Sequence, residues 1–158
     1  MREYIAFALI LLCGPLASGQ TVPEGWQMVR DSKGACQIAV PKDWAPFMEN
    51  SGAATFHDST TAIAVVTSQP GQIFKALTES MVKMLGIEKD RMFENTAKRL
   101  FYQDRIARGP DDQNAYSASV PSKGGTCSCH IAFVKSVPEE TAKKIALSLG
   151  PVPETAPQ

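Results

Sequence analysis

An excess of charge of either sign is what this sequence most clearly lacks. Its 16 Lys and Arg side chains are balanced by 16 Asp and Glu side chains, so the formal net charge is zero. A nucleic-acid-binding protein needs a clustered positive excess to meet the phosphate backbone, and this composition argues against such a partner. A charged fraction of 20% with 44% hydrophobic residues indicates a globular chain and excludes a disordered one.

Long hydrophobic runs are also scarce. The one that stands out, residues 4–13, has about half of the roughly 20 residues that a membrane-spanning helix needs. An Arg precedes it, a Gly-Pro pair ends it, and small residues at 17–19 fit a cleavage site. This layout is that of a secretory signal peptide, residues 1–19, although a membrane anchor is the alternative. We expect a secreted or periplasmic mature protein, monomeric and without a membrane span.

The chain after the signal peptide is long enough for one domain and short for two. We predict a single globular domain over residues 20–150. The last eight residues, 151–158, include three Pro and have no apolar set to bury, so they are predicted to form a disordered tail.

Alternation of apolar and polar residues predicts strands along most of this domain. Two such runs around the turn at 31–34 indicate a hairpin. The run at 61–67 is rich in β-branched residues and is expected near the centre of a sheet. The predicted strands are residues 26–29, 36–40, 55–57, 61–67, 97–106, 115–120 and 126–135.

Two segments have the spacing of amphipathic helices. In residues 70–85 the apolar side chains recur on one helical face, which we expect to pack on the core. Gly86 followed by Ile87 predicts a Schellman ending for this helix. The second helix is predicted to begin with a capping box between Ser136 and Glu139 and to end before Gly150. The apolar face of the first helix consists of Ile73, Leu77, Met81, Met84 and Leu85.

These elements predict an α+β domain with a single antiparallel sheet of about six or seven strands flanked by helices. The stretch from Gly25 to Asp31, and the apolar-Pro-x-x-Trp turn from Val40 to Trp44, resemble the opening of the PsbP-like family. The later helix, the second hairpin and the terminal helix fit the order of that family over residues 24–150. The resemblance implies a PsbP-like α/β/α sandwich and non-enzymatic binding or assembly roles in exported relatives. No functional residue of the family can be matched individually.

Cysteine is sparse. Of four cysteines, Cys13 would leave with the signal peptide, so three remain. On a strand at 126–135, Cys127 and Cys129 would share one face, and Cys36 lies on an apolar face of its own strand. An exported protein meets an oxidising compartment, so a disulfide from Cys36 to Cys127 or Cys129 is expected. Either pairing leaves one thiol over.

The odd thiol leaves a second interpretation open. Cys36, Cys127 and Cys129, completed by His130 or His57, could bind copper or zinc or carry out thiol redox chemistry. Against this, Cys-x-Cys is not a usual zinc spacing, and His130 would point to the opposite face of a regular strand. The redox motif Cys-x-x-Cys is missing. We therefore predict no cofactor.

No set of residues in the sequence indicates catalysis. A nucleophile at a fitting position beside His57 is not visible, and Gly124-Gly125 does not precede a helix, as a phosphate loop would. Trp26 and Trp44 could line a ligand groove. The sequence therefore predicts an exported binding or assembly module that is not an enzyme, for an unknown protein or small ligand. A thiol-based metal-binding or redox protein is the alternative.

Overall fold

The computed structural model describes residues 22–50, 53–58, 61–106 and 113–154. The predicted signal peptide lies outside these ranges, as do residues 155–158 of the predicted tail. No helix in the described ranges has the length and apolarity that crossing a membrane requires.

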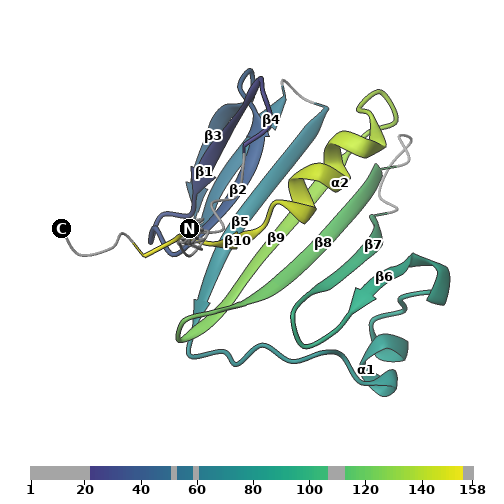
Figure 1. Cartoon of the computed structure of the whole chain (residues 1–158). Helices are drawn as coiled ribbons and strands as arrows, with labels where there is room; N and C mark the ends of the chain where they lie inside the picture. Colours follow the sequence, from purple (N-terminus) through teal and green to yellow (C-terminus); the bar gives the residue numbers. More distant parts are fainter. Residues whose placement is uncertain (1–21, 51–52, 59–60, 107–112, 155–158) are drawn as a thin grey trace, which may run out of the picture.

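Seven antiparallel strands form the larger of two sheets, in the order β3-β4-β5-β9-β8-β7-β6 (Figure 1). The predicted strand at 61–67 becomes β5, which pairs with β9 along its whole length, from Ala62 opposite Phe133 to Pro70 opposite Gly125. The strands of this sheet are β3 (Ala45–Asn50), β4 (Ala53–Asp58), β5 (Ala62–Pro70), β6 (Met92–Asn95), β7 (Leu100–Ile106), β8 (Gln113–Ser122) and β9 (Gly125–Phe133).

The hairpin predicted at 26–40 forms, but it belongs to a separate small sheet, which corrects the expectation of a single sheet. This sheet has the order β1-β2-β10 and consists of β1 (Trp26–Arg30), β2 (Cys36–Pro41) and β10 (Gly150–Pro151). After Pro41 the chain makes a turn, closed by the Trp44 N–H donating to the Pro41 carbonyl at 3.1 Å, and enters the larger sheet. Because Cys36, Ile38 and Val40 are fully buried, the hairpin packs by its face and does not join the larger sheet at an edge.

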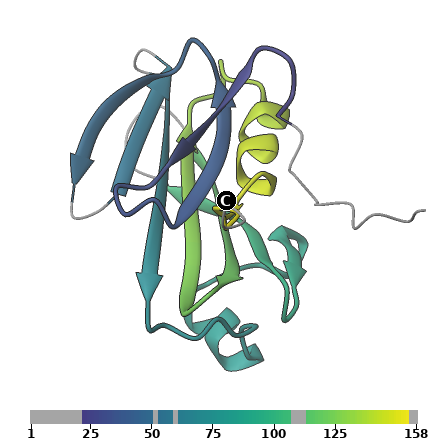
Figure 2. The same cartoon turned by 60° about the vertical axis from the view of Figure 1, so that its left-hand side comes forward.

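The helix α2 (Glu139–Leu147) lies beside the small sheet on the same face of the larger sheet (Figure 2). Its buried residues are Ala142, Ile145 and Ala146, which meet β8, β9 and β2. The apolar core therefore lies between the larger sheet on one side and α2 with the small sheet on the other.

The segment predicted as the first helix, 70–85, is mostly not helical. β5 continues through Pro70, and only α1 (Glu79–Met84) is helical, with Thr78 as its N-cap. The start of the segment is a strand because pairing with β9 provides hydrogen-bond partners for the backbone up to Gln69. The Schellman ending is confirmed, since the Ile87 N–H donates to the Val82 carbonyl at 3.1 Å.

The apolar face predicted for this helix is not part of the core. None of the α1 residues is buried, and Ile73 and Met84 are 78% and 76% exposed. In Figure 1, α1 lies beyond one end of the larger sheet, away from α2. The predicted helix therefore exists only over Glu79–Met84, and the prediction that its apolar face packs on the core is wrong.

The predicted capping box of α2 is also wrong. The helix begins at Glu139 with Pro138 as its N-cap, and no side chain caps it. Glu139, which was predicted to cap the helix with Ser136, instead accepts a hydrogen bond from Tyr116 and forms an ion pair with Lys143. At the other end of α2, Pro151 of the predicted tail pairs with Cys36, and the Val152 N–H donates to the Ala35 carbonyl at 2.9 Å.

Candidate functional site

The predicted disulfide forms between Cys36 and Cys127. Their Cα atoms are 5.6 Å apart and both side chains are fully buried. The bond links β2 of the small sheet to β9 of the larger sheet, across 91 residues of sequence. A disulfide over so long a loop typically stabilises a fold by about 2–4 kcal/mol. It therefore fastens together the two layers that surround the core.

Among the residues that the structure describes, Cys129 is the one cysteine outside the disulfide, and it is buried between β9 and α2. Its Sγ lies 3.9 Å from the carbonyl oxygen of Ala146. Burial raises the pKa of the Cys129 thiol to about 12, so the thiolate that redox chemistry and metal ligation need is disfavoured at neutral pH. Cys129 therefore acts as a small apolar side chain that fills space in the core.

The two histidines do not join the cysteines. His130 lies on the opposite face of β9 from Cys127 and Cys129, where its Nδ1 is 2.9 Å from Ser117 Oγ. Burial lowers the pKa of His130 below its ordinary 6.5. His57 lies on β4, opposite Ile63 of β5. Within the described ranges, no three His, Cys, Asp or Glu side chains are placed to share a metal ion.

The two tryptophans predicted to line a groove have different places. Trp44 is only 4% exposed and belongs to the core. Trp26 is partly buried at the start of β1 and lines a pocket. The structure therefore brings one of the two predicted groove residues to a cavity.

This cavity, which we call the Trp26 pocket, has a volume of about 290 Å³. It lies where the outer face of the small sheet meets the last turn of α2. Met28 pairs with Ala39 across β1 and β2, and Trp26 lies two residues from Met28 on the same face. The lining residues are Pro23, Trp26, Met28, Ala39, Lys144, Leu147 and Ser148.

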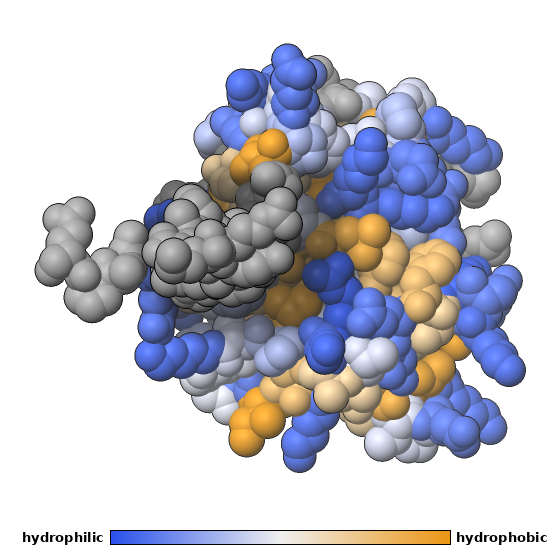
Figure 3. Space-filling view, in the orientation of Figure 1, coloured by the Kyte–Doolittle hydropathy of each residue, from blue (hydrophilic) through white to orange (hydrophobic). Residues whose placement is uncertain are grey.

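The polar groups of the Trp26 pocket are few. Ser148 is occupied by the backbone, because its Oγ accepts from the Ala39 N–H at 2.8 Å and donates to the Ile145 carbonyl at 2.6 Å. These bonds fix the end of α2 against β2. Lys144 is exposed and adds a positive charge to an otherwise apolar lining. Figure 3 shows apolar surface near the middle of the face that carries α2, bordered by hydrophilic side chains.

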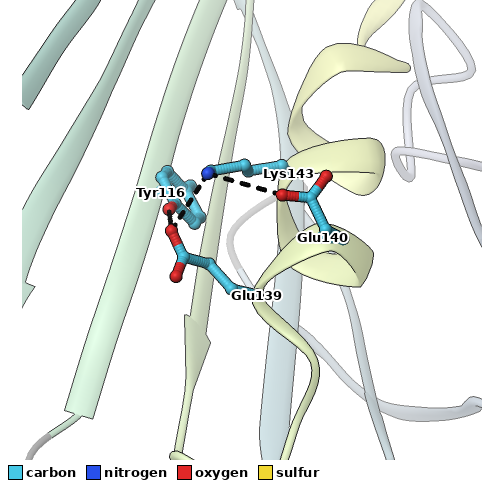
Figure 4. A network of polar contacts seen from close by, with 4 residues as sticks. All are labelled: Tyr116, Glu139, Glu140 and Lys143. Carbon is cyan, nitrogen blue, oxygen red and sulfur yellow. Dashed lines mark hydrogen bonds and ion pairs between the residues drawn. The ribbon is translucent and has the colours of Figure 1, made fainter.

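A polar network at the start of α2 sets where the helix lies on the sheet (Figure 4). The Tyr116 hydroxyl group of β8 donates a short hydrogen bond to Glu139, and Lys143 lies 3.0 Å from Glu139 and 3.6 Å from Glu140. The Lys143 amine also lies 5.8 Å from the ring centres of Phe93 and Tyr116. The sequence does not reveal this network, because Tyr116 is 23 residues from Glu139 and meets it only where α2 packs on β8.

The hydrogen bond from Tyr116, followed by the one from Lys143, holds the pKa of Glu139 below its ordinary 4.5. Burial, and then the bond to Glu139, raise the pKa of Tyr116 well above its usual range. At neutral pH, therefore, Tyr116 is a neutral donor and Glu139 an ionised acceptor. Such a bond anchors an element and does not itself point to catalysis.

Comparisons with known proteins find similarity of fold only. A crystal structure from Bacteroides thetaiotaomicron VPI-5482 matches 75% of this chain with a TM-score of 0.53 and 12% identity, and the chain covers 46% of that protein's length. LpqN, involved in cell envelope biogenesis of Mycobacterium tuberculosis, matches 81% of this chain and 91% of its own, with 14% identity and a TM-score of 0.45. No family model and no curated protein matches the sequence. The likeness to the PsbP-like family accordingly remains a resemblance.

Proposed function

We propose that the protein is an exported binding module that takes up the apolar part of a small ligand in the Trp26 pocket. The observation that carries the proposal is a preformed apolar cavity of about 290 Å³, fixed between β1, β2 and the end of α2. Ligand sites are typically concave, largely apolar and preformed, with few polar groups. The volume is at the small end of such sites, so it suits a short alkyl chain or a single ring.

Two further observations support this function. The resemblance to the PsbP-like family implies binding roles without catalysis. The buried Cys36–Cys127 disulfide is typical of proteins that fold in an oxidising compartment, which favours secretion or the periplasm. A metal-binding or redox role for the thiols would first require this disulfide to be reduced, since it occupies two of the three candidate sulfurs.

The test uses Trp26 as its own reporter. In a Trp44→Phe variant, Trp26 is the single tryptophan, and titration with 1-decanol is expected to change its fluorescence saturably. Ala39→Ile adds apolar atoms to the lining of the pocket, at a strand position whose side chain is 3% exposed. We expect this change to weaken decanol binding about tenfold or more, measured by fluorescence and by calorimetry.

Ala132→Ile is the matched control, because Ala132 also lies on a strand but on the face of β9 opposite the core. It should leave decanol binding unchanged. The absence of saturable binding to the parent protein, or equal losses in both Ile variants, would contradict the proposal. The thermal unfolding midpoint of each variant identifies any loss that comes from unfolding.

A further inference from the structure

A second hollow adjoins the Trp26 pocket along the same strand. It has a volume of about 490 Å³ and is lined by Gln37 of β2, by Lys98 and Arg99, and by Val120 and Leu149 together with three prolines. We call it the Arg99 pocket. Side chains on a strand alternate between faces, so Gln37 lies on the same face of β2 as Ala39 of the Trp26 pocket. Two residues of strand span about 7 Å, which places the two hollows side by side.

The chain that leaves α2 runs between both hollows. Leu147 and Ser148 line the Trp26 pocket, and Leu149 and Gly150 line the Arg99 pocket. The Arg99 Nη1 donates to the Leu147 carbonyl at 2.9 Å. The guanidinium group of one hollow is therefore attached to a residue that forms the wall of the other.

The charge of the Arg99 pocket is of one sign. Lys98 and Arg99 are its charged residues, and no Asp or Glu occurs among the described residues that line it. Both cations belong to a turn held by Thr96, whose Oγ1 accepts from their backbone N–H groups at 3.2 and 3.1 Å. The nearby carboxylate of Glu94 accepts a hydrogen bond from the same Thr96 hydroxyl group, at 2.9 Å. Two cations on an ordered turn beside apolar walls favour an anionic group that carries an apolar body.

We propose that the ligand is a single-chain acidic amphiphile, with its alkyl chain in the Trp26 pocket and its anionic head beside Lys98 and Arg99. This inference rests on the proposed function and adds the chemical class of the ligand. The small volume of the Trp26 pocket favours a short alkyl chain. The positive charges of the Arg99 pocket favour an acidic head group over a neutral or cationic one.

The experiment compares ligands that share a chain and differ in the head. Decanoate, decyl phosphate and 1-decanol are titrated by calorimetry below the concentrations at which they form micelles. We expect both acids to bind about tenfold or more tightly than decanol, because hydrogen bonds to charged groups contribute more than neutral ones. Added salt should reduce this preference, since the head lies near the surface. The order of the two acids distinguishes a carboxylate ligand from a phosphate ligand.

Lys98→Gln is the decisive variant, since no hydrogen bond of the fold uses its side chain among those seen in the described residues. It should lower the affinity for the acids severalfold and leave the affinity for decanol unchanged. Lys83→Gln is the matched control, because Lys83 lies on α1 and lines neither hollow. It should change neither affinity.

The outcomes separate the two proposals. If decanol and the acids bind equally tightly, and all are lost in Ala39→Ile, the proposed function stands and the acidic head is refuted. If Lys144→Gln abolishes the preference for acids while Lys98→Gln does not, the head lies at Lys144 and the assignment to the Arg99 pocket is overturned. If no ligand binds at all, the proposed function itself fails.

Discussion

Tyr116 illustrates how a single residue ties the fold together. Its ring is fully buried and stacks on Phe133, with ring centres 5.7 Å apart, while its hydroxyl group reaches Glu139 on α2. A buried hydroxyl group without a partner costs free energy, so the bond to Glu139 makes this position of α2 the favoured one. Because Glu139 has a lowered pKa in the fold, its ionised form is the one that stabilises the native state.

Tyr116→Phe should lower the free energy of unfolding by about 1.5–3 kcal/mol at neutral pH, the range for a hydrogen bond to a charged group. The contribution of Glu139 is present above its ordinary pKa of 4.5 and is lost as the pH falls below that value through the lowered folded pKa. The difference in the free energy of unfolding between the parent protein and the variant should therefore become smaller at acidic pH. Urea unfolding across this pH range measures it. A difference that stays constant with pH would contradict the role assigned to the bond.

At the scale of the element, the two helices show that similar apolar patterns in the sequence can lead to opposite burial. Both segments have apolar residues at helical spacing, yet α2 buries its apolar residues and α1 buries none. Periodicity reports which side chains share a face, but not whether another element covers that face.

The sequence did not predict the edge strands β3 and β6. Each of them pairs with a neighbour on one side only, with an irregular register. The β3 strand also contains Pro46, which an edge strand tolerates.

A pair of substitutions tests this difference between the helices. Met84→Gln on α1 should change the free energy of unfolding by less than about 0.5 kcal/mol, since the side chain is 76% exposed. Ile145→Ala on α2 should lower it by about 2–5 kcal/mol, since that side chain is fully buried. Chemical denaturation measures both. A large loss for Met84→Gln would mean that α1 packs on the core after all.

At the scale of the whole molecule, the disulfide joins two layers that share no strand pairing in the described residues. Side-chain packing, the Cys36–Cys127 bond and a hydrogen bond of 2.5 Å from Ser68 on β5 to Asp31 in the β1–β2 turn hold the two sheets face to face. The Trp26 pocket is built on the outer face of that small sheet. Its geometry therefore depends on a cross-link on the opposite face of β2.

Thiol titration under denaturing conditions of the chain without residues 1–19, and hence without Cys13, should give one thiol without reductant, from Cys129, and three after reduction. In the native protein the same thiol should react slowly, because it is buried and its pKa is raised to about 12. The double variant Cys36→Ala/Cys127→Ala should lose about 2–4 kcal/mol of stability. Three reactive thiols in the non-reduced sample would contradict the structural role of the disulfide.

The sequence alone determined local features: the strands other than β3, β6 and β10, the hairpins, and the Schellman ending at Gly86. These depend on neighbours in the chain, whose preferences and periodicity are visible in the sequence. It also narrowed the disulfide to Cys36 with Cys127 or Cys129. Only the tertiary structure decided which of the two pairs, since the choice depends on how β2 lies over β9. The division into two sheets and the meeting of Trp26 with the end of α2 were likewise decided by packing between segments far apart in sequence, which no local pattern records.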